Sequence, residues 1–185
     1  RWFFNPRGGK NKTTDDYGPL IQMCQLMDPR TTSNDAFDNR AWSQLDVEEI
    51  LRVWAIELNI DDWDTWAGNR GKNCYLYRYP ADGLWRKVPW DLELTYGNVS
   101  AFSMPSSITQ TYSNHFTEIT RMINRPRMKR MYYGILAGMV DPTTGFFSSG
   151  FLSPYTSRLA SAGVGSMNNA SSGGFIDQRA QRIQS

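Results

Sequence analysis

Residues 73–91 have the sequence NCYLYRYPADGLWRKVPWD, in which two aromatic and apolar runs flank a short turn-like segment. The runs span residues 74–79 and 84–90, and Pro, Ala, Asp and Gly lie between them. Pro, Asp and Gly favour a tight turn, with Gly83 adopting a positive φ. The pattern therefore predicts a β-hairpin. Because a hairpin brings its ends together, Asn73 before the first strand should lie near Asp91 after the second.

An acid-rich segment, residues 59–69, leads into this hairpin. Since the segment feeds the first strand, its three aspartates should lie close to Asn73 and Asp91. Carboxylate and amide oxygens suit a hard cation such as Mg²⁺, which proteins commonly share with substrate phosphates. Protein kinases place a catalytic Asp, a metal-binding Asn, a strand pair and a second metal-binding Asp in this order. Spacing and composition also fit a simpler interpretation, in which surface acids flank a Trp-rich core hairpin.

A helix is predicted over residues 46–58. Asp46 can serve as its N-cap, with Glu49 at the third helical position, a spacing that satisfies free amide donors at a helix start. Apolar residues then recur at helical spacing and form one stripe: Val47, Ile50, Leu51, Trp54 and Leu58.

The remaining pattern is mainly helical. We expect a short helix over residues 19–27, a connecting turn or short helix over 31–39, and helices over 114–124 and 126–140. A short helix near Pro154 and a last helix over 175–183 complete the prediction. The expected fold class is α+β, with one hairpin among helices.

Composition limits the chemistry that the chain can perform. Its 185 residues suit one domain or part of a larger one, and its net charge of +2 does not favour nucleic acid as a partner. A single His excludes zinc sites built from several imidazoles and leaves one possible base for a Ser or Cys triad. Carboxylates are therefore expected to carry any catalysis.

Two further features concern the setting of the chain. Cys24 and Cys74 either pair or remain as buried thiols, so the cysteines leave the redox compartment open. The longest apolar runs, such as residues 131–140, fall short of the roughly 20 residues needed for a transmembrane segment. The first residue is Arg and an aromatic run follows it, so we expect further sequence upstream.

Three segments resemble the CotH kinases, a family named for spore coat protein H. They are KNCYLY at residues 72–77, GLW at 83–85 and PWDLELTYG at 89–97. The resemblance extends over most of the chain and implies an atypical protein-kinase fold, of which residues 1–185 would be a single partial domain, the mainly helical C-lobe. The N-lobe with its nucleotide-clamping lysine would precede residue 1, so this piece alone should be inactive.

The resemblance also implies a function and its residues. It implies transfer of a phosphoryl group from ATP, with Mg²⁺ or Mn²⁺, to a Ser or Thr hydroxyl of a protein. Asp91 and Asn73 match the metal-binding Asp and Asn that face the nucleotide. Asp64 best matches the catalytic Asp, with Asp62 as the runner-up, and Glu93 stands where a second acid that binds or supports the metal is common.

A rival hypothesis keeps the kinase-like scaffold without catalysis. In it the chain is part of a secreted or cell-surface binding module, whose acidic, Trp-rich cleft holds Ca²⁺ or a glycan. The family resemblance implies an extracellular, cell-surface or spore-coat setting for either alternative.

Overall fold

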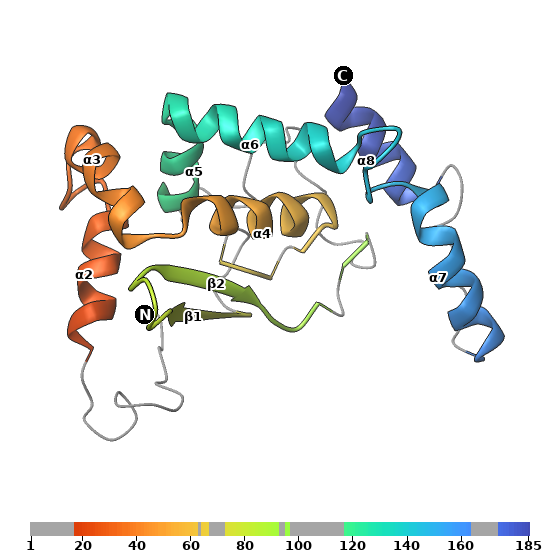
Figure 1. The fold of residues 1–185 in the computed structure, drawn as a ribbon, viewed down its shortest axis with the longest axis horizontal. Helices are drawn as coiled ribbons and strands as arrows, with labels where there is room; N and C mark the ends of the chain where they lie inside the picture. Colours follow the sequence, from red (N-terminus) through yellow and green to blue (C-terminus); the bar gives the residue numbers. More distant parts are fainter. Residues whose placement is uncertain (1–16, 63, 67–72, 93–94, 97–116, 164–173) are drawn as a thin grey trace.

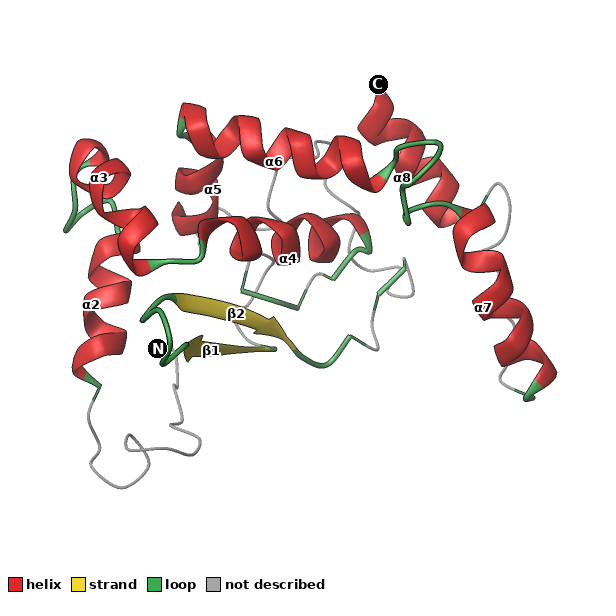
Figure 2. Cartoon of the chain, viewed as in Figure 1, coloured by secondary structure: helices red, strands yellow, loops and turns green. Residues whose placement is uncertain are grey.

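The computed structural model describes residues 17–62, 64–66, 73–92, 95–96, 117–163 and 174–185. In these ranges the helices are α2 (Gly18–Met27), α3 (Asn34–Gln44), α4 (Val47–Asn59), α5 (Thr117–Asn124), α6 (Pro126–Met139), α7 (Ser149–Ser161) and α8 (Phe175–Gln184). The strands are β1 (Cys74–Arg78) and β2 (Trp85–Pro89), which form one antiparallel pair. The predicted α+β class is confirmed, and Figure 2 shows the small sheet among the helices.

Helix α4 lies at the centre of the molecule, with α6 along one side and the hairpin along the other (Figure 1). Its start is as predicted, since the Asp46 side chain accepts a hydrogen bond from the Glu49 amide at 3.2 Å. Every residue of the predicted apolar stripe is buried, and the Trp54 ring lies 4.7 Å from the ring of Tyr132 in α6. The amphipathic pattern therefore fixes which element becomes the core helix.

The hairpin has the predicted turn, and its strands pair Cys74 with Pro89 and Arg78 with Trp85. Gly83 has φ of +72°, and the backbone amides of Gly83 and Tyr79 bond to the carbonyls of Tyr79 and Leu84 respectively. The start of β2 is fastened to the start of α4, because the Asp46 amide donates to the Trp85 carbonyl at 2.9 Å. Arg86 adds ion pairs to Asp46 and Glu49. These bonds set the sheet against α4.

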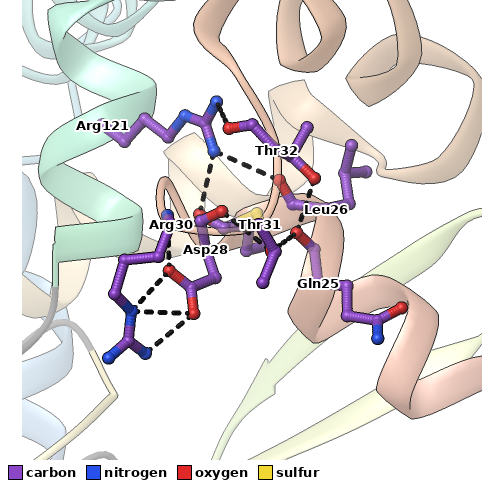
Figure 3. A network of polar contacts seen from close by, with 8 residues as sticks. Gln25, Leu26, Asp28, Arg30, Thr31, Thr32 and Arg121 are labelled. Atoms are coloured by element: carbon purple, nitrogen blue, oxygen red, sulfur yellow. Dashed lines mark hydrogen bonds and ion pairs between the residues drawn. The ribbon is translucent and has the colours of Figure 1, made fainter.

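A buried arginine joins α5 to the α2–α3 connection (Figure 3). The Arg121 guanidinium donates to the carbonyls of Leu26 and Met27 at the end of α2, each at 3.3 Å. It also donates to the carbonyls of Thr32 and Ser33, at 2.6 and 2.7 Å. One side chain thus satisfies backbone acceptors that a helix end leaves without intrahelical partners.

Two helices are longer than expected. Helix α3 was predicted as a connecting turn or short helix, yet it has 11 residues, begins at a Ser33 cap and buries only Phe37 and Ala41. Helix α7 has 13 residues and carries Pro154 in its interior. It buries none of its residues and projects from the molecule on the side opposite α2 (Figure 1).

The structure also shows the state of the two cysteines and the character of the helices with respect to a membrane. Cys24 and Cys74 are both free thiols, Cys24 at the surface and Cys74 half-buried, so they do not pair with each other. Among the described helices, none combines the length and apolar character that crossing a membrane requires.

Candidate functional site

The loop that follows α4 places its aspartates in the interior. Asp61, Asp62 and Asp64 are 5%, 3% and 8% exposed. The Asp62 amide donates to the Glu57 carbonyl at 2.9 Å, and Asp61 adopts a φ of +64°, so the chain turns back sharply at the helix end. Carboxylates are rarely buried so completely unless they are paired or functional. The loop is therefore more than a polar surface connection, contrary to the simpler interpretation.

The structure brings Asp64 and Asn73 together. The Asn73 side-chain amide donates to the Asp64 carboxylate at 3.4 Å, and the Asn73 carbonyl accepts from the Trp90 amide at 3.0 Å. Asp91 follows Trp90 directly, so its backbone lies beside Asn73 at the open end of the hairpin. The Asp91 side chain is exposed to solvent. The two hairpin ends thus meet as predicted, and the acidic loop reaches one of them through the bond between Asp64 and Asn73.

A buried ion pair lies under this loop. Lys87, in the middle of β2, pairs with Glu57 near the end of α4, and both side chains are almost fully buried. The Lys87 ammonium also donates to the Thr65 hydroxyl at 3.0 Å. Since Thr65 follows Asp64, a single lysine links the hairpin, the helix and the acidic loop.

Burial changes the acidity of two loop carboxyls. Burial raises the pKa of Asp62 to about 7, and repulsion from the neighbouring Glu57 carboxylate raises it in the same direction. Burial also raises the pKa of Asp61 to about 6, against an opposing interaction with Arg179 of α8. One oxygen of each carboxyl has no hydrogen-bond partner among the described residues. Carboxyls with pKa values near neutrality are common where a site uses them as acid or base.

The fit to a divalent cation rests on the donor chemistry at the hairpin ends. Within the described ranges, no three His, Cys, Asp or Glu side chains gather closely enough to hold a metal ion. Mg²⁺ is often bound by one or two protein oxygens and completed by water and substrate phosphates, so it does not require such a group. The Asn73 amide and the exposed Asp91 carboxylate supply oxygens of this kind. Glu93, the third predicted ligand, lies outside the described residues.

Sequence reasoning missed the residues that support this site. Glu57, Lys87 and Arg179 are all buried, and the Arg179 Nε donates to the Asn59 side chain at the end of α4 at 2.8 Å. They lie far apart in the chain, and no motif joins them. The one available signal was Lys87 itself, a charged residue at the centre of a predicted strand, two positions from Trp85 and two from Pro89.

Comparison with known proteins identifies the family of the chain. The family model described as CotH kinase protein matches residues 5–172, which is most of the chain. No curated protein matches the chain. The matched range includes the acidic loop, the hairpin and α4 to α7, while α8 lies beyond it. The chain therefore belongs to the CotH kinase family, whose members are at family level kinase-like phosphotransferases.

Proposed function

We propose that this chain carries the catalytic loop and metal-binding residues of a protein kinase that uses ATP with Mg²⁺ or Mn²⁺. The γ-phosphoryl group would pass to a Ser or Thr hydroxyl of a protein substrate. The observation that supports this proposal most directly is the hydrogen bond between Asp64 and Asn73, beside the Trp90 amide. It joins the proposed base to the hairpin whose ends carry the proposed metal ligands.

The roles follow from chemistry and position. Asp64 would orient the attacking hydroxyl and accept its proton, as the catalytic Asp does in protein kinases. Asn73 and Asp91 would hold the cation, which neutralises charge on the phosphates when bound. Asp62 remains the second candidate for the base, because its pKa of about 7 suits proton transfer near neutral pH.

The position of these residues also supports the proposed lobe. A central helix, an acidic loop and a two-stranded hairpin occur in the chain order of a kinase C-lobe. We place the lysine that clamps the nucleotide in a separate N-lobe and expect residues 1–185 alone to be inactive.

The test is phosphoryl transfer by the full-length protein from labelled ATP, with and without Mg²⁺. Asp64→Asn and Asp91→Ala should each lower kcat at least a hundredfold, the usual order for loss of a group that acts in the transition state. The exposed Asp35, in α3, supplies a control, and Asp35→Asn should leave the rate unchanged. If the wild-type protein bound neither ATP nor Mg²⁺ at millimolar concentration, the proposal would be wrong.

One observation favours the non-catalytic alternative. Trp90 is 59% exposed, which does not fit a Trp-rich core hairpin, and its ring contacts the exposed Tyr75 ring edge to face at 5.7 Å. Tyr77, which lies in β1 with Tyr75, is also exposed. Exposed aromatic rings beside acidic groups suit a glycan or Ca²⁺-dependent binding surface of a secreted or cell-surface module. Glycan binding that is lost in Trp90→Ala, together with the absence of ATP binding, would support this alternative.

A further inference from the structure

Lys87 is a charged residue in a position that normally holds an apolar one. Its side chain is fully buried, and the Glu57 carboxylate that it pairs with is 1% exposed. Around its ammonium group lie Glu57, the Thr65 hydroxyl, and the Asp62 carboxyl, which it influences electrostatically. Buried ion pairs of this kind are often no more stabilising than well-packed apolar residues of similar size. Stability alone therefore does not explain why β2 carries a lysine here.

The contacts of Lys87 indicate what it does instead. It bonds to α4 through Glu57 and to the acidic loop through Thr65, the residue after Asp64. From the other side, Asp64 is bonded to Asn73, which precedes β1. Two bonds therefore connect this part of the loop to the hairpin. The Asp64 carboxylate bonds to Asn73 before β1, and the hydroxyl of the next residue, Thr65, bonds to Lys87 in β2.

We propose that Lys87 is a positioning residue, which fixes the Asp64 loop against the hairpin that carries Asn73 and Asp91. This inference rests on the proposed function, because it assigns Lys87 a part in phosphoryl transfer through Asp64. Displacement of a catalytic group by about 1 Å is enough to slow a reaction a hundredfold. Lys87 does not touch the reacting groups, so its loss should affect turnover and leave ATP binding in place.

The test separates positioning from folding by replacing the whole ion pair. Lys87→Met/Glu57→Met removes both charges and keeps similar side-chain volumes, so the variant should unfold at or above the wild-type temperature. In the full-length protein we expect kcat to fall at least tenfold, with KM and Kd for ATP in the presence of Mg²⁺ within threefold of wild type. The Asp62 amide, bonded to the Glu57 carbonyl, should exchange its hydrogen faster.

A surface ion pair on the same helix provides the matched control. Glu48 and Arg52 form an exposed pair in α4, so Glu48→Met/Arg52→Met removes the same two charges far from the loop. This control should keep wild-type kcat and wild-type exchange of the Asp62 amide. If the Lys87/Glu57 variant also kept kcat within twofold, Lys87 would be only structural and the inference would be wrong.

Two single variants complete the design. Thr65→Val removes only the hydroxyl that Lys87 binds and should lower kcat at least threefold with KM unchanged. It decides the question if the double variant does not fold, because an unchanged kcat in Thr65→Val would contradict the inference. Asp64→Asn tests the proposed function independently. Full activity in Asp64→Asn rejects Asp64 as the base, whereas an inactive Asp64→Asn beside a fully active Lys87/Glu57 variant rejects only the role of Lys87.

Discussion

Among the residues that the structure describes, four other than glycine have positive φ angles, and all four border the candidate site. They are Asp61, Asn73, Asp91 and Tyr96, with φ between +54° and +65°. This region of backbone space costs most residues with a Cβ atom roughly 1 kcal/mol or more, although Asp and Asn adopt it more readily than other side chains do. Such residues cluster where function constrains the backbone. Their positions, at the end of α4 and at both ends of the hairpin, mark the same place as the buried carboxylates do.

The strain at Asp91 leads to a stability prediction. Asp91→Ala and Asp91→Gly both remove the carboxylate, but only glycine adopts a φ of +65° without steric cost. Asp91→Gly should therefore be about 1 kcal/mol more stable than Asp91→Ala, and both should lack phosphoryl transfer. Urea denaturation of the two variants measures the difference. Equal stabilities would show that the backbone at this position is not strained.

The buried Asp62 carboxyl predicts an unusual dependence of stability on pH. Its pKa is about 7 in the folded chain and about 4 when unfolded, so the folded state binds more protons between these values. The free energy of unfolding should then fall as the pH rises from about 4 to about 7. Asp62→Asn should be more stable than wild type at pH 8, by at most about 4 kcal/mol, and equally stable near pH 4.

Urea denaturation at pH 4 and pH 8 checks this prediction. The comparison needs Asp35→Asn as a control, because Asp35 is exposed and its replacement should change stability by no more than about 0.5 kcal/mol at either pH. A difference between Asp62→Asn and wild type that is the same at both pH values would contradict the assignment of a raised pKa to Asp62.

At the scale of elements, the predictable parts of the fold are those with local signals. The α4 helix has a capping residue and one apolar stripe, and the hairpin has a turn with a suitable glycine. Helix α3 buries only two side chains, so its sequence contains no apolar stripe. Its predicted length was therefore too short. Helix α7 buries none of its residues, so no hydrophobic pattern in the sequence indicates how long this helix is.

The candidate site divides in the same way. Asp64, Asn73 and Asp91 lie next to elements with clear patterns, so their approach could be inferred from the hairpin. The Glu57–Lys87 pair joins residues 30 positions apart and depends on how β2 packs against α4. Nothing in the local sequence specifies such a pairing, because tertiary packing decides it.

Arg121 of α5 joins the end of α2 to the start of α3. Arg121 is 6% exposed and donates to four backbone carbonyls, so Arg121→Met should leave buried acceptors without partners. A cost of about 3 kcal/mol is expected, since each unsatisfied buried group costs about 1 to 3 kcal/mol. Chemical denaturation measures it, with replacement of the exposed Arg130 on the adjacent α6, Arg130→Met, as the control. A loss below 1 kcal/mol would show that water or rearrangement replaces these bonds.

At the scale of the whole molecule, α8 packs against the end of α4 that leads into the acidic loop, where Arg179 bonds to Asn59. It lies beyond residues 5–172, which match the family model, yet Ile176 and Arg179 are buried. Phe175 contacts the ring of Tyr96 edge to face, and the Asp177 carboxylate accepts bonds from the Ser149 amide and hydroxyl at the start of α7. The last helix therefore holds together segments from both sides of the hairpin.

Arg179 makes this packing testable, because a second arginine on the same helix serves as its control. Arg179 bonds to Asn59 and interacts with Asp61, whereas Arg182 is exposed. Arg179→Met should cost about 2 kcal/mol of stability, since it leaves the buried Asn59 oxygen without its donor, while Arg182→Met should change stability by less than about 0.5 kcal/mol. Thermal and urea unfolding give both values. Equal effects of the two substitutions would mean that α8 packs through its apolar residues alone, and that the loop after α4 keeps its conformation without the Arg179 charge.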